Sequence, residues 1–444
     1  MPAPFSPGRL GADFTRLWTA SAVSNLGDGV TGLAGPLLVA SLTDSPALVA
    51  GAALAQRLPW LLFSLPAGAW VDRLDQRRLL VAVNLARGAL LGGLTLAVWT
   101  GTATIPILYV TFFLFGTGET LSDSTSVALV PSIVPAEGLA RANARLLGTY
   151  LVGNQLLAPP FGAWLFVVVP ALPFAFDAVS FLAAALLVAP LVGRVPARAR
   201  EDRGRALRVE IAEGLGWLWR HRTLRLLAVC VAVMNLAGAG SFAIWVLWAR
   251  ERLGLEGVGF GALITAYAVG GVLGTSLAGR LDARFGPAVL LRAGLWMEAA
   301  AQLVLALTRV PWVAAATLVL FGTHATVWGV VSMSLRQRIV PEDLRGRVNS
   351  VYFLFDLGGA AVGTLLGAVL ASAFGITAPF WLGSLAVALL ALASWRWFRG
   401  PARPPAGPRR RTGQGGGRSG SPGRRGSRGG PARPPGAPAR SPRR

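Results

Sequence analysis

The sequence predicts an all-α membrane protein with twelve transmembrane helices in two six-helix bundles and both termini in the cytoplasm. Composition is the first reason: 53% of the 444 residues are hydrophobic and 14% are charged, whereas a soluble protein has about 25% charged residues. The mean hydropathy of +0.56 agrees with this class. The lengths of the apolar segments and the distribution of arginine between the connections are the other two reasons.

Twelve apolar segments follow one another along the chain. Each is long enough to cross a hydrocarbon core of about 30 Å as a helix that rises about 1.5 Å per residue. We therefore expect spans near residues 14–42, 46–70, 79–100, 105–129, 143–169, 172–192, 224–249, 258–279, 288–308, 311–335, 347–373 and 377–398.

Arginine gathers in alternate connections, and such residues mark the cytoplasmic side of a membrane protein. With the N-terminus inside, the opposite side holds only Arg250, Arg252 and Arg309. The loop 193–222 and the other cytoplasmic connections hold most of the remaining loop arginines. An even number of spans then places the C-terminus inside as well.

The chain repeats itself after about 206–211 residues, which predicts two similar halves. The stretch 134–143 after the fourth span recurs at 340–349, and the stretch 68–73 after the second span recurs at 279–284. We therefore expect an N-terminal segment (1–13), a first bundle (14–192), an inter-bundle loop (193–222), a second bundle (223–398) and a tail (399–444).

The tail is basic and poor in apolar residues. Residues 400–444 carry 12 arginines and no acid, against a net charge of +22 for the chain. A segment of this composition cannot bury a core, so we expect it to be disordered. Anionic lipid at the inner leaflet is the favoured contact, and no nucleic-acid partner is expected.

Several classes of chemistry are excluded by residues that are missing or rare. The chain has no lysine, which excludes a P-loop nucleotide site and Schiff-base chemistry. Cys230 is the single cysteine, so no intrachain disulfide can form. With two histidines and no metal-binding motif, we expect no metal, no cofactor and no enzymatic activity.

The connection between spans two and three resembles the signature loop of the major facilitator superfamily. Its pattern is Gly68, Asp72, Arg73, Arg77 and Arg78. The resemblance implies a gate in which Asp72 and the arginines pair across the bundle interface while the cytoplasmic side is closed. The alternative is plain positive-inside charge.

Two departures accompany this loop. Asp75 stands where the superfamily usually has glycine, and Ala283 takes the usual acidic position in the second half, which implies a weakened second gate. The stretch 134–143 resembles the branch that holds the enterobactin exporter and the macrolide efflux proteins.

A proline-rich segment in the fifth span resembles the Gly-Pro-x-x-Gly-Gly motif of superfamily antiporters. It reads Ala158, Pro159, Pro160, Phe161, Gly162, Ala163, so alanine replaces two of the motif's glycines. Proline removes a backbone hydrogen bond, and small residues allow close packing, so a bend is expected. The resemblance implies export; the alternative is an ordinary proline kink.

Six acidic residues lie inside the expected spans, where a charge costs about 2.5–3.5 kcal/mol unless it is paired, protonated or hydrated. We expect Asp177 near the interface, Asp123 capping polar groups, and Glu298 packing with Gln302. The candidates for proton coupling are Asp28, Glu119, Asp123 and Asp356.

Other polar residues in the spans are candidates for a substrate cavity. Asp28 and Arg57 lie at similar depth on adjacent spans, so they could form either a gated or a permanent ion pair. His324 could relay a proton or simply pack. The cavity candidates are Asn25, Arg57, Asn154, Gln155, Asn235 and His324.

The resemblance implies a monomeric transporter of the cell membrane that exports a hydrophobic small molecule of drug, macrolide or siderophore type. Protons and the substrate are its expected partners, apart from the lipid bilayer. Import or facilitated passage of a metabolite is the alternative within transport. A membrane-embedded enzyme or a receptor is less consistent with the repeat.

Overall fold

The computed structural model describes residues 10–71, 74–191, 215–341 and 344–395. Across these ranges all regular structure is helical and no strand occurs. The helices of the first half are α1 (Ala12–Leu42), α2 (Pro46–Val71), α3 (Gln76–Trp99), α4 (Ile105–Ile133), η1 (Ala136–Gly138), α5 (Leu139–Thr149), η2 (Tyr150–Leu157), α6 (Ala158–Val168) and α7 (Leu172–Val188). Those of the second half are α9 (Arg222–Phe242), α10 (Trp245–Leu253), α11 (Val258–Phe285), α12 (Pro287–Leu307), α13 (Pro311–Ile339), α14 (Arg345–Phe374) and α15 (Ala378–Ser394).

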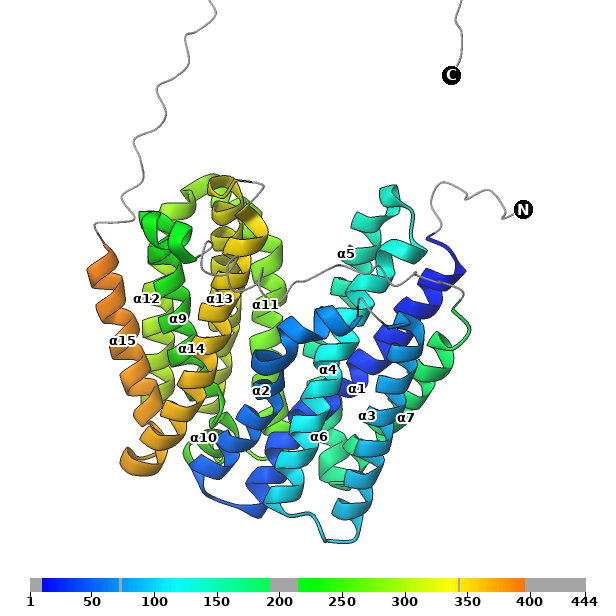
Figure 1. Cartoon of the computed structure of the whole chain (residues 1–444). Coiled ribbons are helices and arrows are strands. Elements are labelled where there is room, and N and C mark those ends of the chain that lie inside the picture. Colours follow the sequence, from blue (N-terminus) through cyan, green and yellow to red (C-terminus); the bar gives the residue numbers. More distant parts are fainter. Residues whose placement is uncertain (1–9, 72–73, 192–214, 342–343, 396–444) are drawn as a thin grey trace, which may run out of the picture. The chain divides into compact units, whose positions relative to one another are not determined.

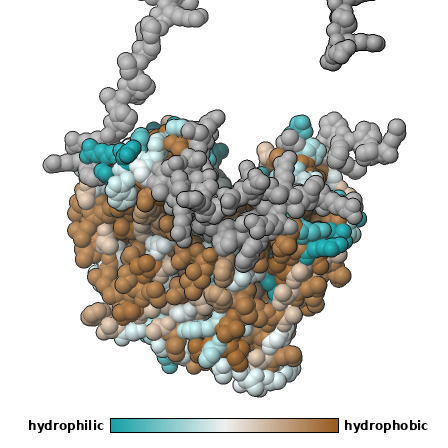
Figure 2. Space-filling view, viewed as in Figure 1, coloured by the Kyte–Doolittle hydropathy of each residue, from teal (hydrophilic) through white to brown (hydrophobic). Residues whose placement is uncertain are grey.

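Nine helices of the described part are long and apolar enough to cross a membrane, and α7 and α15 are shorter apolar helices. Their outer surface suits lipid, because hydrophobic side chains cover most of the face shown in Figure 2. Local signals fix many helix starts. Proline occupies the first turn of α4, α7, α12, α13 and α15, where its missing N–H has no intrahelical partner in any case.

The helices pack in two sets, one from each half of the chain (Figure 1). In the first set α1 packs on α6 and α7, α2 on α4, and α3 on both α4 and α7. In the second set α9 packs on α14 and α15, α11 on α13, and α12 on α13 and α15. The main contacts between the sets join α2 to α14 and α6 to α11.

Glycine allows the closest of these helix pairs to form. A Cβ added at Gly116 of α4 would lie 2.2 Å from the Gln56 carbonyl oxygen on α2. A Cβ at Gly322 of α13 would lie 2.0 Å from the Tyr267 carbonyl oxygen on α11. Small residues at such contacts let backbones approach, which is how helices associate when the solvent is itself apolar.

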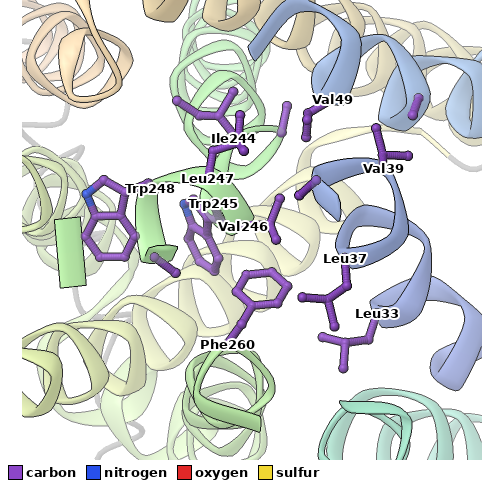
Figure 3. Packing of buried hydrophobic residues seen from close by; sticks show 14 of the residues in the cluster. Leu33, Leu37, Val39, Val49, Ile244, Trp245, Val246, Leu247, Trp248 and Phe260 are labelled. Carbon is purple, nitrogen blue, oxygen red and sulfur yellow. The ribbon is translucent and has the colours of Figure 1, made fainter. Parts of the chain in front are cut away.

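The two sets meet in a shared apolar core beside α10 (Figure 3). Leu33, Leu37 and Val49 of the first set face Val246 and Phe260 of the second. The connection between α1 and α2 is also held by Arg250 of α10. Its guanidinium donates to the Ala40 carbonyl oxygen at 2.9 Å and pairs with the carboxylate of Asp44. This end of the molecule is therefore closed by direct contact between the sets.

One predicted span differs from the structure. Residues 224–249 were expected to form a single helix, but the helix breaks at Ala243 and Ile244 and resumes as α10. Burial of two indoles accompanies the break: Trp245 packs edge-on against Tyr267, and Trp248 packs against Phe380. Most of the loop 193–222 and all of the tail 399–444 lie outside the described residues, as do the expectations made for them.

Candidate functional site

A cavity of about 310 Å³ lies between the two sets and is called the central cavity below. Apolar and aromatic side chains form most of its wall. Its lining residues come from α1, α2, α4, η2 and α6 of the first set and from α9, α10, α11 and α14 of the second. Its polar lining comprises Asp28, Gln56, Arg57, Glu119, Tyr150, Asn154, Gln155, Tyr267 and Thr364.

Two further cavities adjoin residues of the central one. The first-set cavity, of about 650 Å³, is lined by several serines together with Asn25, Asp28 and Asp123. The second-set cavity, of about 620 Å³, is lined by Arg57, Asn235 and Asp356 among others. Asp28 therefore faces both the first-set and central cavities, and Arg57 faces both the central and second-set cavities.

Asp28 is held by Arg87 of α3. The Arg87 Nη2 donates to the Asp28 Oδ1 at 2.6 Å, and both side chains are largely buried. The guanidinium lies between two phenyl rings, 4.3 Å from the centre of Phe115 and 4.1 Å from that of Phe181. Gly118 leaves room for its stem, since a Cβ there would lie 2.7 Å from the Arg87 Cγ. These contacts hold the Arg87 guanidinium against Asp28.

The expected pairing of Asp28 with Arg57 is therefore wrong. α2 packs on α4 and α14, which turns Arg57 toward the second set, where its guanidinium carbon lies 5.7 Å from the centre of the Phe242 ring. Arg87, in the third apolar segment, was not among the residues predicted to pair with Asp28. An arginine within the apolar segment 79–100 is itself a signal, since such a charge needs a partner.

Glu119 and Asp123, one turn apart on α4, face different cavities. Glu119 lines the central cavity, and its carboxylate makes no hydrogen bond or ion pair with any described residue. Asp123 lines the first-set cavity and is exposed there. The expectation that Asp123 caps polar groups is not met, because its carboxylate has no hydrogen-bond partner in the described ranges.

Asp177 is fully buried, so the expectation that it lies near the interface is wrong. α7 packs against α1 and α3, and this packing places Asp177 beside Gly27. A Cβ at Gly27 would lie 2.1 Å from the Asp177 Oδ1, which also accepts a hydrogen bond from the Ser180 hydroxyl at 3.0 Å. The acid belongs to the interior of the first set.

In the second set, the Asn235 amide donates to the Asp356 Oδ1 at 2.7 Å, and both residues line the second-set cavity. His324 is not among the lining residues of the three cavities, contrary to its choice as a cavity candidate. Its Nε2 lies 3.1 Å from the Oε2 of Glu298, which does line the second-set cavity. Gln302 accepts a hydrogen bond from Ser241 at 2.9 Å, in line with the expected packing role of that helix face.

The remaining amide candidates bind mainly to the backbone or to nearby hydroxyls. Asn25 donates to the Ser21 carbonyl and hydroxyl oxygens at 2.7 and 2.9 Å. Asn154 donates to the Asn25 carbonyl oxygen at 3.0 Å, and Gln155 donates to the Tyr150 hydroxyl at 3.3 Å. Asn154 and Gln155 line the central cavity, whereas Asn25 lines the first-set cavity.

The family of transmembrane secretion effectors, within the major facilitator superfamily, matches residues 2–402. The chain belongs to this family. It is accordingly a multi-pass transporter of the cell membrane.

An uncharacterised transporter of this superfamily from Mycobacterium tuberculosis is 29% identical over 369 residues, which cover 76% of this chain and 80% of the relative. The multidrug efflux pump Tap of Mycolicibacterium fortuitum is 25% identical over 397 residues, covering 84% and 93%. A bacterial homologue of the iron transporter ferroportin shares the fold at 18% identity over 87% of this chain and 99% of that one. Its inward-facing state gives a TM-score of 0.70 and its outward-facing state 0.57.

The superfamily's antiporter-like motif forms a three-way contact. η2 is a π-helical segment, in which the Ala158 N–H bonds to the Gly153 carbonyl oxygen, and it ends where Pro159 and Pro160 begin the next helix without N–H donors. A Cβ at Gly162 would lie 3.0 Å from the Val30 backbone on α1. The Ala163 methyl group packs on Gly261 of α11. The motif thus connects the π-helical segment η2 to a helix that contacts both α1 and the second set.

The superfamily's signature loop is described only in part, since Asp72 and Arg73 lie outside the described residues. Gly68 belongs to the last turns of α2, and Arg77 and Arg78 to the first turn of α3. Asp75 has a local role: its side chain caps α3 by accepting from the Arg78 N–H at 3.1 Å.

The corresponding loop in the second half keeps an ion pair. Asp282 of α11 lies 3.9 Å from Arg338 of α13. The pair forms without an acid at Ala283, the position that the superfamily's pattern favours.

Proposed function

We propose that this chain is a twelve-helix secondary active transporter that exports hydrophobic small molecules in exchange for protons by alternating access. One observation carries the proposal. The apolar cavity between the two sets of helices is lined by the Glu119 carboxylate, which has no hydrogen-bond or ion-pair partner among the described residues, and by Asp28, which pairs with Arg87. A carboxyl group in this cavity can bind either a proton or a ligand. Exchange of a substrate for a proton requires that the two compete in this way.

The topology follows from the helices and the arginines. Each half supplies six crossings if α5, η2 and α6 count as one crossing and α9 with α10 as another. The bundles would then be residues 14–192 and 223–398, with both termini on the arginine-rich, cytoplasmic side. The end that carries α10 would face outward.

Alternating access is supported by the unequal contact between the sets. Near α10 they share an apolar core and the Arg250 contacts. The greater similarity to the inward-facing than to the outward-facing state of the ferroportin homologue agrees with a state closed toward the outside. Opening that end would require the Arg250 contacts to break.

Exchange would centre on Glu119. In the inward-facing state a substrate that enters the central cavity displaces the proton from this carboxyl group, and in the outward-facing state a proton from outside displaces the substrate. Asp28, which faces both the first-set and the central cavities, provides a hydrated route by which protons reach the centre. The similarity to Tap and the antiporter-like motif support export as the direction.

Accumulation in cells tests this proposal. Cells expressing the chain are loaded with a fluorescent cationic dye or a labelled macrolide, with and without a protonophore. Wild type should lower accumulation, and the protonophore, Glu119→Gln or Asp28→Asn should restore it. Glu256→Gln is the matched control, because Glu256 is exposed in the connection before α11 and lines none of the three cavities.

The other outcomes are equally informative. Higher accumulation with wild type than with empty cells would favour import of a metabolite-like molecule. Export that survives both substitutions would retain transport and remove Asp28 and Glu119 as proton carriers. No change for any compound would contradict export of hydrophobic drugs.

A further inference from the structure

We infer that the substrates are amphoteric: apolar molecules with one cationic amine, bound by Glu119, and one anionic group, bound by Arg57. This inference rests on the proposed function and specifies its substrate class. It comes from two opposite charges that line one cavity and that make no hydrogen bond or ion pair with the described residues.

Arg57 is the first of these charges. It lies within α2, lines the central cavity, and makes no ion pair or hydrogen bond with any residue in the described ranges. Its guanidinium carbon lies 5.7 Å from the centre of the Phe242 ring. Glu119, Asp356 and Tyr267 act on the guanidinium electrostatically without forming an ion pair. An arginine inside a membrane-spanning helix is costly and marks a functional site by default. An anionic group on the ligand would be its missing partner.

Arg87 shows an arginine of the same set that does have an ion-pair partner, although its buried Nε has no hydrogen bond. It has both a carboxylate at 2.6 Å and two phenyl rings around its guanidinium. The contrast matters because Asp28, bound to Arg87, is no longer available to Arg57. Asp356 accepts a hydrogen bond from Asn235 and acts on Arg57 only electrostatically, without an ion pair.

Glu119 is the second charge, and it lies on α4, which packs directly against α2. Although the two helices are neighbours, Glu119 and Arg57 do not come within ion-pair distance of each other. The cavity therefore offers an anionic and a cationic position that are separate. A ligand with one charge would leave the other protein charge unpaired, whereas a ligand with both satisfies the two sites with charge-assisted hydrogen bonds.

The other side chains that line the central cavity indicate the shape of the rest of the substrate. Phe112, Phe242, Phe260 and Tyr267 present aromatic faces, and the volume of about 310 Å³ is at the lower end for small-molecule sites. A compact, fused-ring body with an amine at one end and a carboxylate at the other suits this shape and charge.

Three quinolone probes separate the two charges. Norfloxacin carries a basic piperazine and a carboxylate, its ethyl ester carries the piperazine alone, and nalidixic acid carries the carboxylate alone. Binding to the purified full-length chain in nanodiscs is measured by equilibrium dialysis. We expect norfloxacin to bind about tenfold more tightly than either of the other probes, the size of one charged hydrogen bond.

Variants assign each charge to its residue. Arg57→Gln should weaken norfloxacin binding about tenfold and leave the ester unchanged, and Glu119→Gln should weaken norfloxacin and leave nalidixic acid unchanged. Arg57→Lys, which keeps the charge, should preserve most of the preference and show that the fold is intact. Arg292→Gln is the control, since Arg292 packs over Trp395 and lines none of the three cavities.

Three outcomes would overturn the inference. These are equal binding of norfloxacin and its ester to wild type, equal weakening of both by Arg57→Gln, and no binding of norfloxacin. Transport by inside-out vesicles separates this inference from the proposed function. Proton-driven uptake of norfloxacin that its ester matches would sink only the amphoteric assignment, while no proton-driven uptake of any probe or dye would sink both.

Discussion

The two halves of this transporter both bury carboxyl groups, but they give them different partners. In the first half Asp28 binds a guanidinium, whereas in the second half Asp356 binds an amide and Glu298 binds an imidazole. Asn235 lies 207 residues after Asp28, within the separation of about 206–211 residues between the repeated loops. The repeat has therefore kept a polar group at this position but not its charge. At this repeated position a carboxylate can exchange a proton and an amide cannot, which supports our proposal that proton coupling involves the first half.

The halves also differ in which helix is irregular. In the first half the helical stretch 139–168 contains a π-helical segment and two prolines, while the corresponding α14 of the second half runs unbroken from Arg345 to Phe374. Conversely, α1 is continuous and its counterpart breaks between α9 and α10. Both irregular helices touch the other set. The repeat has thus diverged at helices that contact the other set.

The largest expected effect tests the charged pair of the first half. Arg87→Leu leaves Asp28 without a partner in the interior, which should lower the free energy of unfolding by about 3 kcal/mol and abolish export. Denaturant unfolding of the purified protein, followed by tryptophan fluorescence, measures the loss. The double variant Asp28→Asn/Arg87→Leu should recover most of the stability but not export. A stable, active Arg87→Leu protein would remove the contrast between the halves.

The next largest effect tests the close contact between Gly27 and Asp177 in the first half. Gly27→Ala places a methyl group 2.1 Å from the Asp177 Oδ1, and overpacking of this kind costs about 2 kcal/mol. Gly32→Ala on the same helix meets nothing within 4 Å, so it should be neutral or slightly stabilising. Thermal unfolding of the two variants side by side measures the difference. Equal melting temperatures would mean that Asp177 does not depend on Gly27.

A smaller effect is expected from the acid of the second half. Glu298→Gln keeps a hydrogen bond to His324 and removes only the charge, so the free energy of unfolding should fall by about 1 kcal/mol or less. Proton-driven dye export should persist, in contrast to Glu119→Gln. Export rates in inside-out vesicles at equal protein levels check this expectation. Loss of coupling in Glu298→Gln would show that both halves take part.

The smallest effect concerns the contact that closes the α10 end. Because Asp44 is 87% exposed, its ion pair with Arg250 is weak, and Arg250→Gln should favour opening by about 1 kcal/mol, roughly fivefold in population. Spin labels at Leu42 and Glu251, in a Cys230→Ser background, report the separation of the sets. Arg309→Gln, an exposed arginine of the second half without a described partner, should leave the distances unchanged. An unaltered distance distribution in Arg250→Gln would argue against a latch.

Much of this could be predicted from the sequence. The helical membrane class and membership of the major facilitator superfamily are confirmed, and the positions of most helices agree with the apolar segments. The prediction rests on a strong constraint: lipid cannot hydrogen-bond to the backbone, so long apolar helices are required and are easily recognised. The twelve crossings, the bundle boundaries and the orientation stay predictions, and so do the roles of the proton and gating residues.

The sequence by itself determined that this protein is embedded in lipid, that it is helical, and which polar residues its helices carry into the membrane. The tertiary structure decided which of those residues meet. Asp28 pairs with Arg87 rather than Arg57, Asp177 is buried inside the first set, and His324 contacts Glu298. The reason is that both the lipid-facing and the core-facing sides of these helices are apolar. Hydrophobic periodicity therefore leaves the rotation of each helix and its neighbours undetermined, and only packing at contacts such as those of Gly27 and Gly118 settles them.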